Sequence, residues 1–343
     1  MTLNLQTDTS GPLRENLQIL SAFLDNAENT EICINAPGVV FTESHKGWKR
    51  HELPELTLEK CRHLAKYIAS YSGQKLDEVT PVVSATLPTG ERVQLVTSPA
   101  VPRDRVSITI RKPSNVELSL DDYQRAGAFD VVQDSAEDLS PEEEQLTQLQ
   151  QQKRYKEFLE LAVASRQNII VSGSTGSGKT TLMKTLINLV PNDERLLSIE
   201  NVDELKIYVS HQNVVPLFYS AGGLGVSEID QQQLLESSLR MKPDRIFLAE
   251  LIRGDEAFYY LRNVNSGHPG SITSMHANSA KLAIEQLVLF LKESQSGSTM
   301  SRQDIKQLLF MCVDVIVQMK VINRKRVITE IYYDPLFKRA QMG

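Results

Sequence analysis

Residues 169–180 read IIVSGSTGSGKT, and this stretch decides the fold of the C-terminal half of the chain. From Gly173 to Thr180 it matches the pattern G-x-x-x-x-G-K-[ST], directly after an apolar run. A helix-like run, TLMKTLINLV (181–190), follows at once. A strand, a glycine-rich turn and a helix in this order form a P-loop, whose backbone N–H groups and helix N-terminus bind phosphate. We therefore predict a nucleoside triphosphate site at this turn.

The chemistry of a P-loop gives its residues distinct roles. The glycines let backbone N–H groups converge on phosphate oxygens. Lys179 is expected to neutralise charge on the β- and γ-phosphates, and the Thr180 hydroxyl is expected to bind Mg²⁺. ATP with Mg²⁺ is thus the expected ligand. The predicted phosphate-binding residues of the loop are Gly173, Ser174, Thr175, Gly176, Ser177, Gly178, Lys179, Thr180 and Thr181.

Strand-like and helix-like segments alternate from residue 166 onward. The strand-like segments are NIIVSG (168–173), RLLSIE (195–200), VVPLFY (214–219), RIFLAE (245–250) and SITSM (271–275). Helices are expected up to Val190, around 228–241, and over 254–265 and 279–293. This alternation predicts an α/β fold with a largely parallel sheet covered by helices.

A smaller α+β domain is predicted for residues 1–112. Its expected elements are helices over 13–26 and from Thr57 to Gly73, a hairpin over 31–43, and strands over 82–87, 92–97 and 107–111. Residues 113–139 are polar and are predicted to be a linker, long enough for the two domains of one chain to pack in more than one way. Ser140 begins a helix with Pro at its first position and Glu at its third, so the P-loop domain is assigned residues 140–343.

The composition narrows the classes of protein that the chain can belong to. Its 343 residues, 41% of them hydrophobic, are enough for one or two packed cores. A net charge of -6 argues against a protein whose main function is to bind nucleic acid through phosphates. No run approaches the ~20 apolar residues of a membrane span, and the N-terminus has no signal-peptide pattern, so we expect a soluble protein with only peripheral membrane contact. Cys33, Cys61 and Cys312 have no paired spacing, which is typical of buried thiols in a reducing compartment.

Two glutamates follow strand-like segments and are candidates for catalysis. Glu250 ends RIFLAE and is expected to orient the attacking water, with a structural ion pair as the alternative. Ala249 stands where many such strands carry an aspartate. Glu200 ends RLLSIE, and carboxylates at the carboxyl ends of parallel strands face the ligand crevice, so Glu200 is expected to position water or metal-bound water. Asp203 and Glu204 are expected on a solvated face or at the start of a helix.

The segment SGHPGSITSMHAN (266–278) holds two histidines, His268 and His276. A zinc site would need further ligands in tetrahedral geometry, and no Cys, Asp or Glu lies between residues 266 and 278. A metal site is therefore disfavoured. A loop histidine with satisfied hydrogen bonds is the alternative to a functional role, and His268, beside a proline, is expected mainly to shape the loop.

The four segments GSTGSGKT, SIENVDEL, LRMKPDRIFLAEL and SGHPGSITSMHA occur in an order that resembles the Walker A, acidic, Walker B and histidine boxes of the type II/type IV secretion ATPase family. In the N-terminal half, TLPTGERVQL and SITIRKPS are similar to the N-terminal domain of the traffic ATPases of type IV secretion systems. The resemblance implies a RecA-like ATPase domain and a ring of six subunits. It implies hydrolysis of ATP with Mg²⁺ to power assembly of, or transport through, a type IV secretion apparatus. It also implies a place at the cytoplasmic face of the inner membrane, with other ATPases and inner-membrane components as partners. Direct specific nucleic-acid binding is not expected, because the charge balance is acidic.

The resemblance extends to single residues. It implies that His276 belongs to a segment that senses the γ-phosphate and that Arg92 and Arg111 reach toward the phosphates, whereas ordinary exposed strand arginines are the alternative. With Lys179, Glu250 and Glu200, His276 completes the predicted catalytic set.

This chain departs from the family pattern at two places. Asn201 replaces the usual aspartate after Glu200, and the stretch from Glu250 to Arg253 is one residue longer than usual. Arg253 is the candidate for the basic residue that the family has after this glutamate, Arg240 is an alternative for contacts at a subunit boundary, and the sequence leaves both roles open.

Two other functions are kept as alternatives. One is a nucleic-acid translocase on a RecA-like core, against which the acidic balance argues. The other is a nucleotide-gated scaffold that does not hydrolyse ATP, which Ala249 and Asn201 would allow.

Overall fold

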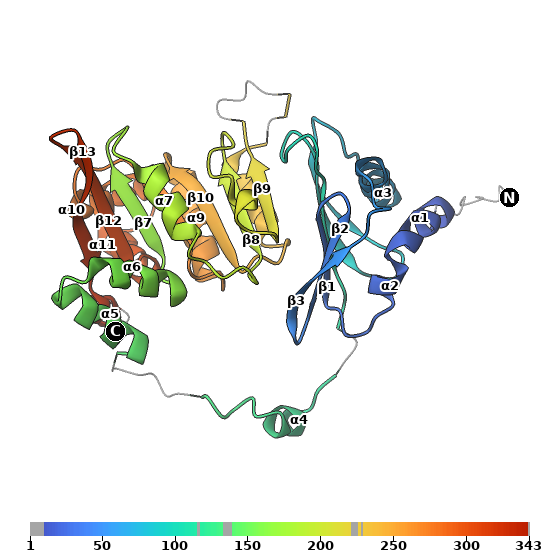
Figure 1. Ribbon diagram of the computed structural model, residues 1–343, viewed down its shortest axis with the longest axis horizontal. Coiled ribbons are helices and arrows are strands. Elements are labelled where there is room, and N and C mark those ends of the chain that lie inside the picture. The colour runs from blue at the N-terminus through green and yellow to red at the C-terminus, as the bar shows by residue number, and fades with distance from the viewer. Residues whose placement is uncertain (1–9, 115–116, 133–138, 221–225, 228, 342–343) are drawn as a thin grey trace.

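The computed structural model describes residues 10–114, 117–132, 139–220, 226–227 and 229–341. Within them the chain forms two bodies, each built on its own sheet, and residues 117–132 lie along one side of the molecule between the two (Figure 1). The first nine residues of the predicted N-terminal domain, two parts of the predicted linker and residue 228 of a predicted helix lie outside the described residues.

The P-loop half is built on a sheet with the strand order β13-β12-β7-β11-β10-β8-β9. Its strands are β7 (Ile169–Gly173), β8 (Leu196–Glu200), β9 (Val214–Phe218), β10 (Arg245–Leu251), β11 (Ile272–Met275), β12 (Val315–Ile322) and β13 (Lys325–Tyr333). All neighbours pair in parallel except β12 and β13, which form an antiparallel hairpin at one edge. Every residue of β7 and β8 is buried, as expected of parallel strands that helices cover on both faces. The predicted α/β class is confirmed.

Helices form a layer on each face of this sheet and create two hydrophobic cores. The helices of one layer are α5 (Pro141–Gln151), α6 (Tyr155–Ala164) and α7 (Lys179–Ile187), and those of the other are α8 (Gln231–Ser238), α9 (Gly254–Asn265), α10 (Ala280–Glu293) and α11 (Arg302–Cys312). The short helices η2 (Ile207–Val209) and α12 (Pro335–Ala340) complete this half. Ser140 forms the expected capping box with Glu143. The chain turns between α5 and α6 because Lys153 adopts a left-handed conformation with φ of 58°.

The N-terminal half contains an antiparallel sheet with the strand order β3-β2-β1-β6-β5-β4. Its strands are β1 (Glu31–Ala36), β2 (Val39–Ser44), β3 (Gly47–Glu52), β4 (Val82–Thr86), β5 (Arg92–Val96) and β6 (Ser107–Arg111). Its helices are α1 (Ser10–Leu17), η1 (Gln18–Leu20), α2 (Ser21–Leu24) and α3 (Leu58–Tyr71), and they share one core with the sheet. β3 is not among the predicted strands, because its polar composition hides its pairing with β2. Cys33, Cys61 and Cys312 are buried and unpaired, as predicted.

The two halves are linked through the segment that carries α4 (Leu120–Arg125), and they also contact each other directly. Arg195, which is 0% exposed, donates from its guanidinium to Asn35 Oδ1 at 2.9 Å and to Thr109 Oγ1 at 3.2 Å in the N-terminal half. The Trp48 indole donates to Asp244 Oδ2 at 3.0 Å in the opposite direction. This buried polar contact sets the position of one sheet relative to the other. The domain boundaries at residues 112 and 139 stay predictions.

Candidate nucleotide site

The P-loop backbone has the conformation that its glycines make possible. β7 ends at Gly173, and α7 begins at Lys179. Between them Gly176 and Gly178 have φ of 75° and 95°, a left-handed region that other residues rarely adopt. A side chain at Gly173 has no room either, because its Cβ would lie 2.6 Å from Ser177 Oγ and 2.7 Å from the Met319 carbonyl oxygen. The loop is thus held tightly against the sheet.

A cavity of about 480 Å³ lies over this loop, at the carboxyl ends of the parallel strands. Thr175, Gly176, Gly178, Lys179, Thr180 and Thr181 line it, together with Asn201, Val202, Glu204, Tyr219, Ala249, Glu250, Ile252, Ser274, His276 and Arg326. Six of the nine predicted loop residues therefore face the cavity. The other three, Gly173, Ser174 and Ser177, do not line it.

Lys179 is only 8% exposed. Its Nζ donates to the carbonyl oxygen of Gly173 at 3.0 Å and to that of Ser174 at 3.3 Å. Burial lowers the pKa of Lys179, and the negative charges of Glu250 and Glu204 oppose this shift. The ammonium group is therefore poorly solvated, and a phosphate in the cavity would compensate its charge well.

His276 connects Lys179 to Glu250. Its Nδ1 lies 3.4 Å from Lys179 Nζ, and its Nε2 lies 2.9 Å from Glu250 Oε1. A charged ammonium group can only donate, so Nδ1 is the acceptor and the ring proton resides on Nε2, which faces the carboxylate. Three of the four predicted catalytic residues are thus joined by two consecutive contacts in the cavity, with His276 in the middle.

Glu200, the fourth, is positioned differently. It is 0% exposed and does not line the cavity. Its carboxylate accepts from Ser198 Oγ at 2.7 Å and from the backbone N–H groups of Glu204 at 3.0 Å and Leu205 at 2.8 Å. Burial raises the pKa of Glu200, and these donors counteract the shift. Glu204, which we expected on a solvated face or at the start of a helix, is exposed and lines the cavity. Asn201 is also exposed and lines it.

Arg92 and Arg111 lie opposite each other on β5 and β6 and are exposed. Arg111 Nε is 3.6 Å from Glu31 Oε1. Neither arginine lines the cavity, so the structure does not bring them to the P-loop of the same chain. Arg240 donates to Ser84 Oγ of β4 at 3.2 Å and thereby contacts the N-terminal half of its own chain.

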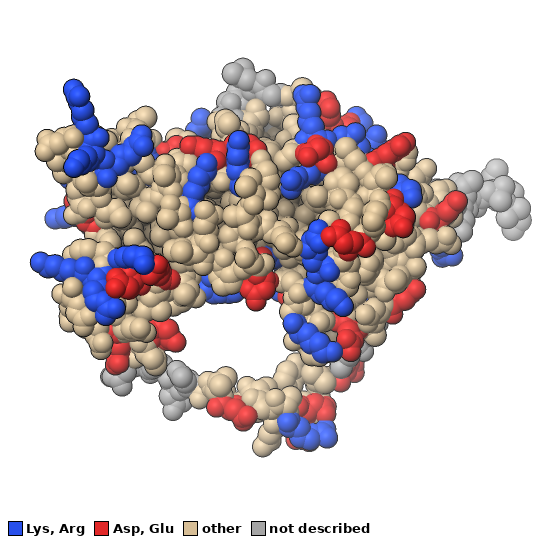
Figure 2. Space-filling model, viewed as in Figure 1, with Lys and Arg blue, Asp and Glu red and all other residues tan. Residues whose placement is uncertain are grey.

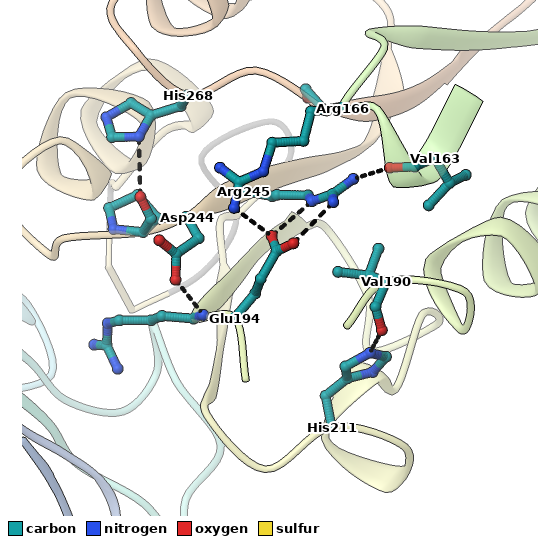
Figure 3. A network of polar contacts seen from close by, with 12 residues as sticks. Val163, Arg166, Val190, Glu194, His211, Asp244, Arg245 and His268 are labelled. Atoms are coloured by element: carbon teal, nitrogen blue, oxygen red, sulfur yellow. Dashed lines mark hydrogen bonds and ion pairs between the residues drawn. The ribbon is translucent and has the colours of Figure 1, made fainter. Parts of the chain in front are cut away.

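His268 lies apart from the cavity, in the polar network of Figure 3. Its Nδ1 is 3.0 Å from the carbonyl oxygen of Pro243. Nearby, Arg245 and Glu194 form a buried ion pair, with Arg245 Nε donating to Glu194 Oε2 at 2.7 Å. Glu194 lies just before β8 and Arg245 begins β10, so this ion pair lies at the amino ends of these strands, whereas the P-loop follows the carboxyl end of β7. His268 thus contacts the loop before β10 rather than the cavity, and its role in shaping the loop stays a prediction.

The cavity suits a magnesium ion that is bound mainly by phosphate and water. Thr180 places a hydroxyl in the wall, and the carboxylates of Glu204 and Glu250 lie in the same wall. Among the described residues, no group of three His, Cys, Asp or Glu side chains could hold a metal ion alone. Magnesium at phosphates needs no such group, because the nucleotide and water supply most of its ligands.

Two charged residues of the cavity wall are not in the set of site residues predicted from the sequence. One is Glu204, and the other is Arg326 of β13. Arg326 lies far beyond the P-loop in the sequence and belongs to none of the four motifs. Only the basic run NRKR (323–326) marks its position in the chain, and such a run does not reveal what the side chain contacts.

A parallel sheet with helices on both faces, a P-loop at its carboxyl edge, and a lysine, a histidine and a glutamate in one line over that loop define a P-loop ATPase of RecA-like fold. Comparison with known proteins agrees with this class. A family model described as "Type II/IV secretion system protein" matches residues 50–326. The chain belongs to this family and is a secretion ATPase of its type IV branch.

Individual relatives extend the similarity over nearly the whole chain. It is 44% identical to the "Type IV secretion system protein VirB11" of Bartonella quintana, over 99% of this chain and 98% of that protein. It is 41% identical to the protein of the same name from Brucella suis, over 95% of this chain and 91% of that protein. A crystal structure of "the VirB11 ATPase from the Brucella Suis type IV secretion system in complex with sulphate" superposes with a TM-score of 0.89 at 40% identity, covering 96% of this chain and 99% of the other. The predicted family is confirmed.

Proposed function

We propose that this chain hydrolyses ATP with Mg²⁺ as a homohexameric motor that powers assembly of, or transport through, a type IV secretion apparatus. The line from Lys179 through His276 to Glu250, set over the P-loop, is the observation that carries the catalytic part of this proposal. It joins the group that binds phosphate charge to the group that handles water.

In this proposal the nucleotide phosphates lie on the N–H groups of the loop and the N-terminus of α7. Lys179 turns from the Gly173 and Ser174 carbonyls to the β- and γ-phosphates. Glu250 accepts a hydrogen bond from a water molecule and directs the water oxygen at the γ-phosphorus. The new P–O bond forms as the bond to the β–γ bridging oxygen breaks, Glu250 accepts the proton that the water loses, and ADP and phosphate are released.

His276 acts in this proposal as a sensor rather than as a catalyst of its own. Its Nδ1 accepts from Lys179 and its Nε2 faces Glu250. A γ-phosphate competes for the ammonium group, so Nδ1 becomes free for another donor and the ring can pivot about its contact with Glu250. His276 directly follows β11, and this movement would pass to the centre of the sheet.

Magnesium would be held by the Thr180 hydroxyl and by the nucleotide, and it supplies charge neutralisation at the phosphates. Glu200 acts indirectly in our proposal. Its buried carboxylate binds the N–H groups of Glu204 and Leu205, and it thereby places Glu204 in the cavity wall.

A hexameric ring would give the two N-terminal arginines, Arg92 and Arg111, a nucleotide to bind. Arg92 and Arg111 are exposed and paired across two strands, away from the cavity of their own chain. Guanidinium groups suit phosphate well. We propose that they reach the nucleotide of a neighbouring subunit, so that each site is completed by the next chain. Residues 1–112 and 140–343 would then act as separate units that the linker over 113–139 joins.

The place and partners of the motor follow from its family rather than from its geometry. We propose that it works at the cytoplasmic face of the inner membrane, beside other ATPases and inner-membrane components of the secretion system. In the part of the chain that the structure describes, no helix is both long and apolar enough to cross a membrane.

Two measurements test the proposal. Lys179→Ala should abolish phosphate release from ATP, and full activity in the purified variant would overturn the catalytic assignment. Particle mass with and without Mg·ATP should show a six-subunit ring, and a monomer under both conditions would overturn the hexamer. Stimulation of ATP hydrolysis by single-stranded DNA would favour the alternative of a nucleic-acid translocase.

A further inference from the structure

The hairpin of β12 and β13 reaches over the P-loop from the edge of the sheet. β12 pairs in parallel with β7, and Met319 lies opposite Gly173. The hairpin turns at Asn323 and Arg324, whose φ values are 50° and 61°. Figure 2 shows Lys and Arg side chains gathered at the end of the molecule where this hairpin lies. A basic hairpin tip is thus held beside the nucleotide cavity.

Arg326 makes the contact between hairpin and loop. Its Nε donates to the carbonyl oxygen of Gly176 at 3.3 Å, and the side chain lines the cavity. Its stem lies directly on Gly178, where an added Cβ would be 2.9 Å from Arg326 Cδ. Within the described residues, the Arg326 side chain uses Nε for its hydrogen bond to Gly176. The two terminal nitrogens of its guanidinium group are therefore available to a ligand.

The hairpin is anchored, so this arginine is not a loosely held surface group. Gln318 of β12 donates from Nε2 to the carbonyl oxygen of Ala277 at 3.1 Å. Glu330 of β13 accepts from the backbone N–H of Ala280 at 2.9 Å. Both strands are therefore tied to the segment that follows His276. A preorganised side chain loses less freedom when a ligand binds.

The position of Arg326 indicates which end of a nucleotide it would meet. Lys179 Nζ lies at Gly173, Ser174 and His276, which marks the γ-phosphate end of the site. Arg326 lies instead at Gly176 and Gly178, toward the start of α7, where a P-loop holds the α- and β-phosphates. The nucleoside leaves the loop from the α-phosphate.

We propose that Arg326 is a nucleotide-binding residue that holds the α-phosphate and nucleoside end of ATP and ADP. The inference rests on the proposed ATP site and deepens it. A planar guanidinium group can bind phosphate oxygens or stack on the base, and both interactions exist equally with ATP and ADP. Arg326 therefore contributes uniform binding, which changes affinity but leaves the chemical step alone.

The test compares Arg326→Ala with Arg324→Ala, a change of the same type two residues away at a position that does not line the cavity. Binding is measured by calorimetry, with ADP in the wild-type background and with ATP in the non-hydrolysing Glu250→Gln background. Both affinities should fall by about tenfold in Arg326→Ala, as the loss of a charge-assisted hydrogen bond predicts. The KM for ATP of Arg326→Ala in the otherwise wild-type chain should rise by about tenfold, and its kcat should not fall by more than about twofold. Arg326→Gln, which keeps the packing on Gly178, should also bind weakly, and Arg326→Lys should fall between.

Three results would overturn the assignment. They are equal ADP affinity in the Arg326 and Arg324 variants, a loss of affinity for ATP alone, and a fall in kcat at unchanged ADP affinity. Because ADP binding is measured without hydrolysis, a wild-type chain that binds ADP but does not hydrolyse ATP would overturn the proposed function and leave this inference standing. A wild-type chain that binds neither nucleotide would overturn both.

Discussion

The connection between Lys179 and Glu250 through His276 allows a quantitative prediction for His276→Ala. The change removes the group that lies 2.9 Å from Glu250 Oε1, whereas Lys179 keeps its 3.0 Å bond to the Gly173 carbonyl. A hydrogen bond to a charged group stabilises by about 1.5–3 kcal/mol. If Glu250 loses this orienting bond in the transition state, kcat should fall by about 10- to 100-fold, since about 1.4 kcal/mol corresponds to a factor of ten. The affinity for ADP should change little, because Lys179 remains in place.

Steady-state ATP hydrolysis gives kcat and KM, and calorimetry gives the affinity for ADP. His45→Ala is a suitable control, because His45 is exposed in the N-terminal half and does not line the cavity. His276→Gln should recover part of the lost rate, because the amide N–H group can still donate to Glu250. A kcat within about twofold of wild type in His276→Ala would refute the reasoning, and so would a weaker binding of ADP at unchanged kcat.

Three further predictions concern stability. Burial raises the pKa of Glu31 from 4.5 to about 7, so the folded state binds its proton more tightly than the unfolded state, and its contribution to stability is lost as the pH rises from 4.5 to 7. Unfolding by urea at a series of pH values should therefore give a flatter profile in Glu31→Gln, and an unchanged profile would contradict this. Gly254→Ala should lower the free energy of unfolding by about 1–3 kcal/mol in the same assay, because the added Cβ would overlap the Phe290 carbonyl oxygen. Gly11→Ala is the control and should not lower it, because nothing lies within 4 Å of the added Cβ. Equal stabilities of the two variants would contradict this prediction. Arg195→Met should destabilise by about 3–5 kcal/mol in thermal unfolding, because it leaves buried acceptors of both halves without their donor, and a loss below about 1 kcal/mol would show that the interface does not depend on this residue.

Much of the fold could be predicted from the sequence because the signals are local. The apolar runs of β7, β8 and β10 and the helices between them follow from composition over a few residues. The P-loop was predictable for the same reason, since its glycines and Lys179 are contiguous in the chain. β3 was not predictable, because its residues are polar and only pairing with β2 makes them a strand.

In the nucleotide site, too, some residues could be predicted from local sequence and others could not. Glu250 was found because it is the acidic residue at the end of an apolar strand, and His276 because its segment resembles the histidine box of the family. For Glu200 we used the rule that carboxylates at the carboxyl ends of parallel strands face the ligand crevice. The rule failed to distinguish Glu200 from Glu204. Glu200 ends its strand but is turned into the core by Ser198 and two backbone donors, while Glu204 reaches the cavity from the loop beyond. Which carboxylate faces the cavity depends on the path of that loop.

The class of the protein, its P-loop and the family to which it belongs follow from the sequence alone, because they reside in short contiguous patterns whose chemistry does not depend on distant parts of the chain. By contrast, tertiary packing is what places Arg326 over Gly178 and keeps Arg92 and Arg111 away from the cavity of their own chain. Strand order and hairpin position are set by packing between segments far apart in sequence. A side chain's distance from the P-loop is therefore fixed by the fold as a whole and is not encoded in its own neighbourhood.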